Sequence, residues 1–163
     1  MQIETSYIQP RAVALIRNTT KIIGHILQGV SHEDATTYRD GPDGWTVTEI
    51  VCHIRDFGTI FHERAKRILN EDNPVLTPYD HEKMAIDNRY NEQDVHAVYA
   101  ELVTIYDELA AFYESIAEDQ WDRAGIHPEA GHFPLTKSML QVGTHSALHI
   151  EQMTRVLTQK YAK

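Results

Sequence analysis

Apolar side chains recur at three- and four-residue intervals in four segments of the chain, which is the spacing of a helix with one buried face. The segments cover residues 7–28, 46–70, 92–117 and 136–160. No stretch between them shows convincing strand alternation. Four amphipathic helices predict an all-α fold, a four-helix bundle in which residues 1–163 form a single domain.

Capping signals mark where the later helices begin. Thr46 and Glu49 have the spacing of a capping box, so the second helix should start at Thr46. Asn91 is the predicted N-cap of the third helix. Thr136 is the predicted N-cap of the fourth, with the preceding Leu135 packing against a residue of its first turn.

The second and third helices are separated by a long irregular connection from Asn70 to Asn91, which contains Pro74 and Pro78. One short helical turn is expected in it, near residues 82–86. Connections of this length inside a compact domain are uncommon and often functional. Two interpretations are open, a crossover between the two ends of the bundle and a lid over a site.

Composition narrows the class of protein. The chain is 42% hydrophobic and 24% charged, as expected of a globular protein, and its formal net charge is −9. Lysine and arginine are scattered without a basic run. Phosphate contacts need clustered positive charge, so we expect neither nucleic-acid binding nor attachment to an anionic membrane.

Cysteine usage points to a reducing environment. Cys52 is the only cysteine, so no disulfide can form within the chain. Neither a secretory signal pattern nor an apolar run of membrane-spanning length is present. We therefore expect a cytoplasmic protein in which Cys52 is a small core residue, with no part in chemistry because it points about 100° away from His53 around the helix.

The candidate chemistry lies in the histidines. His145 and His149 are four residues apart on the fourth helix, close to its apolar stripe, where two imidazoles can share one metal ion. With ten histidines in the chain, about 0.6 such pairs arise by chance, so the spacing alone is weak. His53, on the flank of the buried face of the second helix, is the predicted third ligand.

Helix geometry allows this combination under one condition. His53 lies about 10 Å from the start of its helix, and the His145–His149 pair about 16 Å from the start of theirs. The three rings reach similar heights when both helices run in the same direction from a common end. The opposite direction gives a poorer fit.

From the residues alone, two interpretations remain, a metal site and hydrogen-bonded core histidines. His62 is on the opposite side of its helix and should take no part. Another group is expected at the surface or near loops: His25, His32, His81 and His96. His132, in the loop before the fourth helix, is a candidate fourth ligand.

Two segments, GWTVTEIVCHIRDF and FPLTKSMLQVGTHSALHIEQM, resemble the DinB/YfiT-like superfamily of small four-helix-bundle proteins. That family combines a tryptophan-led second helix carrying one histidine with an HxxxH motif on the fourth. The resemblance implies a site in which His53, His145 and His149 bind a divalent transition metal. Zinc or nickel is expected first, and iron or manganese next, since imidazole suits several metals.

The same resemblance suggests function. The superfamily includes S-transferases and isomerases that use low-molecular-weight thiols, and members described as metal-dependent hydrolases. We expect a metal-dependent enzyme acting on a small molecule, with thiol transfer ahead of hydrolysis and a low-molecular-weight thiol as second cofactor. A non-catalytic metal-binding or dimerisation module is the alternative. We also expect a homodimer.

Several neighbours could support the site. Glu49 and Asp56 are one helical turn from His53, and Gln152 is one turn from His149, so each could orient an imidazole. Arg64 projects to the same side of the second helix as His53. It could meet an anionic substrate or lie on the surface as a solvated arginine.

Overall fold

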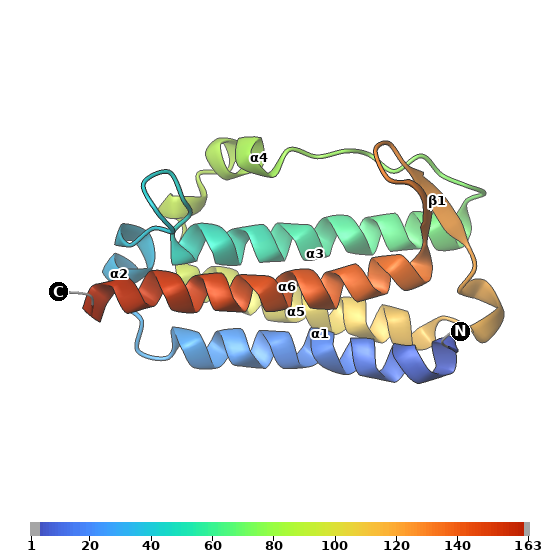
Figure 1. Cartoon of the computed structure of the whole chain (residues 1–163), viewed down its shortest axis with the longest axis horizontal. Coiled ribbons are helices and arrows are strands. Elements are labelled where there is room, and N and C mark those ends of the chain that lie inside the picture. Colours follow the sequence, from blue (N-terminus) through green and yellow to red (C-terminus); the bar gives the residue numbers. More distant parts are fainter. Residues whose placement is uncertain (1–3, 162–163) are drawn as a thin grey trace.

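Four long helices dominate the computed structural model, which describes residues 4–161 (Figure 1). They are α1 (Thr5–Leu27), α3 (Val47–Asn70), α5 (Val95–Ser115) and α6 (Leu135–Thr158). The predicted all-α four-helix bundle is confirmed. Residues 1–3 and 162–163 of the expected domain lie outside the described part. Within that part, no helix combines the length and the apolar character needed to cross a membrane.

The helices pack as a square with an unusual order of directions. Helix α3 contacts α5 and α6, and α1 contacts the same two helices from the other side. Helices α3 and α5 run in one direction, and α1 and α6 run in the other (Figure 1). Two consecutive parallel helices need a connection that travels the length of the bundle, so the segment from residue 71 to residue 94 is a crossover.

This crossover lies along the outside of α3 (Figure 1). It carries the short helix α4 (His81–Asp87), where the sequence predicted a single turn, and the 3-10 turn η1 (Tyr90–Glu92). Its first part pairs with a later segment, since Leu76 N–H donates to the carbonyl of Ile126 at 2.9 Å and Ile126 N–H donates to that of Pro74 at 2.9 Å. The first part of the crossover is therefore fixed to the segment around Ile126.

The start of α3 follows the predicted chemistry. The Thr46 hydroxyl accepts from Glu49 N–H at 3.2 Å, and the Glu49 carboxylate accepts from Thr46 N–H at 2.8 Å, which completes the capping box. Such reciprocal bonds satisfy two of the otherwise unpaired backbone donors of the first turn. The position of His53, six residues later, depends on this start.

Two predicted caps are wrong. Helix α5 starts after Asp94, whose carboxylate accepts from Ala97 N–H at 2.8 Å, while the Asn91 side chain accepts from the Thr46 hydroxyl at 2.6 Å. Helix α6 starts at Leu135 rather than being capped by Thr136. The reason is that Pro134 ends a strand, so the chain enters the helix directly from a sheet.

Five of the short elements in residues 4–161 follow here that the sequence did not predict. Residues 32–37 form helix α2 (His32–Thr37), and a small antiparallel hairpin joins β1 (Ala124–His127) to β2 (Gly131–Pro134). The 3-10 turns η2 (Glu118–Gln120) and η3 (Gln159–Tyr161) follow α5 and α6. Four-residue strands are too short for an alternating pattern to stand out. Gly131, with φ of 66°, allows the tight hairpin turn.

Helices α3 and α5 approach each other closely at Gly58. A methyl group there would lie 2.5 Å from Cε2 of Tyr106, a fully buried side chain. The Tyr106 hydroxyl donates to the carbonyl of Ile54 at 3.1 Å and also bonds the hydroxyl of Ser146 on α6 at 2.8 Å. This tyrosine therefore joins three helices and cannot easily move.

We predict that Gly58→Ala lowers the free energy of unfolding by about 1–3 kcal/mol, because the added methyl overpacks the contact with Tyr106. Gly143→Ala on α6 is the matched control. Its methyl would meet Leu15 Cδ2 at 3.0 Å, and Leu15 is 38% exposed and free to move. The control should gain up to about 1 kcal/mol from helix propensity. Urea unfolding measures both, and equal effects would contradict the close approach.

Candidate metal centre

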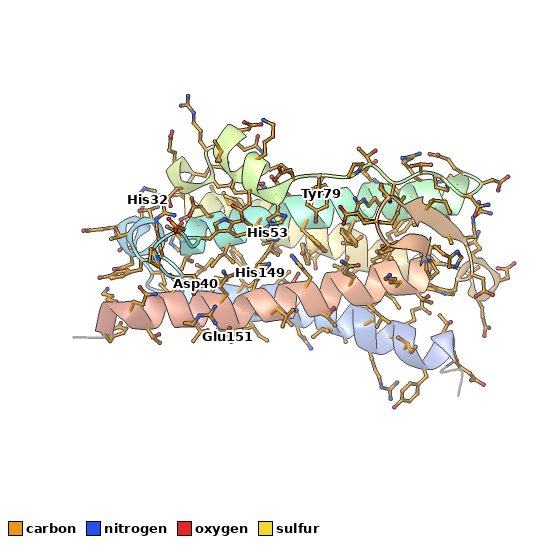
Figure 2. The ribbon with its side chains drawn as sticks, turned by 45° about the horizontal axis from the view of Figure 1, so that its top comes forward. His32, Asp40, His53, Tyr79, His149 and Glu151 are labelled. Carbon is orange, nitrogen blue, oxygen red and sulfur yellow. The ribbon has the colours of Figure 1, made fainter. Side chains whose placement is uncertain are left out.

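Three imidazoles meet between α3 and α6. His53 Nε2 lies 3.2 Å from His145 Nε2, which lies 3.3 Å from His149 Nε2. The candidate ligand atoms of all three rings are within 4.8 Å of one another. His53 is 6% exposed, and the other two are half-buried. Figure 2 shows His53 and His149 facing each other across the space between their helices.

The two helices run in the relative directions for which a poorer fit was expected. Helices α3 and α6 run in opposite directions, yet the rings meet at one height (Figure 1). The expected positions of His53 and of the His145–His149 pair were both counted from the first residue of their own helix. In the structure, the start of α3 lies beside the end of α6, and His149 is nine residues from that end, close to the six residues between Val47 and His53. The antiparallel arrangement is therefore the one that fits.

A hydrogen-bonded chain fixes the orientation of His149. Its Nδ1 lies 2.7 Å from the Gln152 side-chain oxygen, and the Gln152 amide nitrogen donates to Asp40 at 3.0 Å. Arg155 in turn donates to both oxygens of Asp40, at 2.9 and 2.8 Å. Since the amide oxygen can only accept, Nδ1 carries the proton and Nε2 presents a lone pair to the other histidines.

Aromatic rings enclose the cluster. The Phe57 ring stacks on His145 with a centroid separation of 3.7 Å and an interplanar angle of 6°. Trp45 covers the other side, with its ring centroid 4.7 Å from that of His53 and 6.4 Å from that of His149. These rings exclude water from part of the cluster, which strengthens electrostatic interactions inside it.

Burial keeps the three rings neutral. It lowers the pKa of His53 to about 2 and that of His145 to about 3, with further lowering by the neighbouring imidazoles. Burial also lowers the pKa of His149, although the hydrogen bond to Gln152 opposes this. At neutral pH the three rings are therefore in the neutral form, which is the form that binds a divalent metal ion.

The spacing fits a transition metal. Two nitrogens bound to one ion at about 2.0–2.1 Å in tetrahedral geometry lie about 3.3 Å apart. The observed separations of 3.2 and 3.3 Å match this value. Three neutral imidazoles also leave coordination positions open for a water or a substrate, which is the pattern of a catalytic rather than a structural site.

The cluster opens into a pocket of about 510 Å³. Its walls come from three separate parts of the chain: the loop before α3 (Asp43, Gly44, Trp45), the crossover (Tyr79, His81, Glu82), and α3 and α6 themselves. The glutamate carboxylate of Glu82 accepts from the Trp45 indole N–H at 3.2 Å, so the loop and the crossover are joined over the site. This volume suits a small organic molecule.

His81 was expected at the surface or near a loop, and its side chain is indeed exposed, but it also lines the metal pocket. Its ring centroid lies 5.8 Å from that of His53 and 5.8 Å from that of Trp45. The position follows from the crossover, which folds back over α3. The only sequence signal was a histidine directly after Asp80, the N-cap of α4, and capping does not reveal tertiary neighbours.

Other candidates lie elsewhere. His62 packs against Phe112, as expected for the opposite side of α3. His132 is on β2 and lines a different hollow, beside the acidic pair Glu71 and Asp72, so the structure does not support it as a fourth ligand. Cys52 is buried, with its sulfur 3.8 Å from the carbonyl oxygen of Tyr90.

Two expected supporting residues serve other purposes. Glu49 completes the helix cap and bonds Arg39 at 2.9 Å. Asp56 pairs with Arg55 at 2.8 Å and accepts from the Tyr90 hydroxyl at 2.5 Å. Of the three supporting residues proposed from the sequence, Gln152 alone contacts an imidazole of the cluster.

Comparison with known proteins agrees with this architecture. The sequence profile of the DinB superfamily matches residues 15–153. The chain belongs to the DinB superfamily.

Relatives within this superfamily are provisionally named as metal-dependent hydrolases. One, from Oceanobacillus iheyensis, is 26% identical over 125 residues, which cover 77% of this chain and 71% of that protein. YfiT from Bacillus subtilis is 28% identical over 122 residues, covering 74% of this chain and 67% of YfiT.

Solved structures show the same DinB fold. The YfiT structure, described as an unusual four-helix bundle topology, superimposes with a TM-score of 0.87 at 22% identity, covering 99% of this chain and 91% of that chain. A mycothiol-dependent maleylpyruvate isomerase superimposes with a TM-score of 0.72 at 13% identity, covering 89% of this chain and 60% of that one. The second likeness concerns fold alone.

We predict that the protein loaded with zinc or nickel holds about one ion per chain, and that His53→Ala or His149→Ala reduces this to background, because two remaining imidazoles hold a divalent ion poorly. Gln152→Ala should weaken binding by about 10- to 100-fold through loss of ring orientation. Metal analysis after dialysis and competition titration measure both effects. His62→Ala is the control, and loss of metal in that variant would refute the assignment.

We also predict that Cys52 is inert in the folded protein. Burial raises the pKa of its thiol to about 12, so almost no thiolate forms at neutral pH. Ellman's reagent should label it slowly in the native state and rapidly in denaturant. Rapid native labelling would show that the thiol is accessible and reopen a catalytic role.

Proposed function

We propose that this protein is a metal-dependent enzyme that acts on a small molecule, with a divalent ion held by His53, His145 and His149. The observation that carries the proposal is the convergence of three neutral imidazole nitrogens at the wall of a pocket of about 510 Å³. The homodimer and the cytoplasmic location remain predictions.

A divalent ion bound there supplies Lewis acidity, which lowers the pKa of a ligating water or thiol and polarises a substrate oxygen. The protein's own residues do the rest. Gln152 and Asp40 keep the proton of His149 on Nδ1. Trp45 and Phe57 restrict water, and the His81 ring, on the pocket side of the crossover, is placed to accept or donate a proton.

In this proposal the nucleophile comes from outside the chain. Cys52 is buried and its thiol is protonated at neutral pH. Within the described residues, the pocket lining contains no cysteine, serine, threonine or lysine. A thiol cofactor or water is assigned as the source of the attacking atom, and the substrate provides the electrophile.

Thiol transfer is the first candidate. The pocket is many times the size of a water molecule and has room for a thiol-bearing molecule beside an electrophile. A mycothiol-dependent isomerase with the same fold supports this choice. Hydrolysis is the second candidate, favoured by the provisional names of the sequence relatives.

An assay with two arms tests the proposal. Metal-loaded protein is incubated with a haloarene with and without bacterial low-molecular-weight thiols, and in parallel with activated esters and amides. We expect thiol-dependent turnover that survives Cys52→Ser and falls at least about 100-fold in His149→Ala, as expected when the group that activates the nucleophile is lost.

The outcomes separate the candidates. Ester or amide turnover without thiol establishes the hydrolase instead. Turnover in neither arm, with metal bound in the stoichiometry predicted above, leaves the non-catalytic metal-binding module. His81→Gln should lower turnover without changing metal content, since its ring is placed for proton transfer rather than for ligation.

A further inference from the structure

A buried arginine without an anionic partner lies next to the metal pocket. Arg64 on α3 is 5% exposed. One of its terminal nitrogens, Nη2, donates to the carbonyl oxygen of Thr77 at 2.5 Å, and its Nε–H has no hydrogen-bond partner among the described residues. A buried guanidinium remains charged, and such charges are normally paired.

Acidic groups near Arg64 are already paired with other bases. Glu63 accepts from Lys66 at 2.9 Å, and Glu71 accepts from Arg67 at 2.9 Å. No carboxylate in residues 4–161 forms an ion pair with Arg64. The protein therefore supplies a desolvated cation without its counter-ion, although its net charge is −9. An unpaired buried cation of this kind indicates a binding site for an external anion.

Two aromatic rings hold the guanidinium and connect it to the metal pocket. Its central carbon lies 5.4 Å from the centroid of the Phe61 ring and 5.2 Å from that of Tyr79. Tyr79 itself lines the metal pocket. Phe61 stacks at 4.0 Å on Phe57, which lines that pocket as well. The Tyr79 ring therefore contacts the guanidinium and also lines the metal pocket, and it is the link between the two.

Helix geometry agrees with this proximity. Arg64 is eleven residues after His53, which places both side chains within about 20° on the same face of α3 and their Cα atoms roughly 16 Å apart. Helical side chains lean towards the N-terminus, so the long arginine side chain reaches back towards His53. Figure 2 shows Tyr79 on the C-terminal side of His53 along α3, the side on which Arg64 follows in the sequence.

The guanidinium lines a hollow of about 230 Å³ between α3 and the crossover. The other lining residues are Thr59, Ile60, Glu63, Arg67 and Thr77. Two of these residues are charged, and both are paired outside the hollow, Glu63 with Lys66 and Arg67 with Glu71, so Arg64 is the one buried cation there. This lining suits the carboxylate of an aliphatic molecule, because one guanidinium can bind a carboxylate through two parallel hydrogen bonds.

We propose that the Arg64 hollow is a subsite for the carboxylate of the small molecule whose reactive end enters the three-histidine pocket. This inference rests on the proposed function for the role of that pocket, and it assigns the ligand a chemical class. The ligand is an aliphatic carboxylic acid long enough to extend from the histidines past Tyr79.

A purely structural role makes a different prediction. If Arg64 only fastens the crossover to α3 through Thr77 and the two rings, its replacement changes stability but creates no selectivity for anions. Arg64→Gln removes the charge and keeps an amide that can donate to Thr77. Selectivity between a carboxylate and a neutral amide of the same shape therefore distinguishes the two roles.

The first experiment needs no metal. Butyrate is titrated into isotopically labelled, metal-free protein, and amide signals from residues 59–67 and 75–79 are followed by NMR, with butyramide as the neutral comparison. We expect saturable shifts with butyrate alone, and binding at least about tenfold weaker in Arg64→Gln, the loss expected for a charge-assisted hydrogen bond.

Arg17→Gln, at an arginine paired with Glu114 on the far helix, is the control and should bind like the wild type. Equal shifts with butyrate and butyramide, no saturation, or unchanged binding in Arg64→Gln would each overturn the proposal. If Arg64→Gln does not fold, the comparison of the two probes in the wild type decides.

The second experiment tests the connection to the histidines. Cobalt-loaded protein is titrated with mercaptoalkanoic acids and with mercaptoalkanols of increasing chain length, and thiolate binding is followed by charge-transfer absorption. Acids should bind more tightly than alcohols only beyond a threshold length, and Arg64→Gln should abolish the difference.

If the absorption shows that acids and alcohols bind with equal affinity at every chain length, the connection between the Arg64 hollow and the three-histidine pocket is refuted. Absence of absorption with every thiol would count against thiol ligation in the proposed function, and the carboxylate titration would still decide the role of Arg64.

Discussion

Three imidazoles directed at one point impose the strictest constraint on this structure. Their Nε2 atoms lie 3.2 and 3.3 Å apart along the cluster, and binding one metal ion requires these separations to be kept. The surrounding protein must therefore hold α3 and α6 in register. The chain from His149 through Gln152 to Asp40 and Arg155 does this at one end of the bundle. Tyr106, bonded to both helices, does so in the core.

The order of helix directions explains where the pocket comes from. Because α3 and α5 are parallel, the chain must return along the bundle between them, and this return places Tyr79 and His81 over the face that carries His53. A simple up-and-down bundle would connect the same helices with a short turn and leave the histidines open to solvent. The long connection is thus the origin of the enclosed site.

Periodicity was enough to predict the bundle, whereas HxxxH with a third histidine on a buried flank left a metal site and hydrogen-bonded core histidines both open, and the family resemblance favoured the metal site. These features are encoded locally, within one helix each. The direction of α6 relative to α3, the position of His81 and the burial of Arg64 depend on how the crossover folds back, which no local pattern encodes. The hairpin of residues 124–134 was missed because its strands are four residues long and are stabilised partly by the distant Pro74–Leu76 segment.

The histidines lie on the helices and other pocket residues lie on the crossover, and this separation has an evolutionary consequence. The candidate ligands and their orienting residues lie mainly on α3 and α6, whereas Tyr79, His81, Glu82 and Thr77 belong to a separate surface segment. Substitutions in that segment can reshape the chamber while the helices that carry the histidines keep their packing. Descendants of one ancestral bundle can therefore acquire new substrates through changes in this segment while the histidine site is kept.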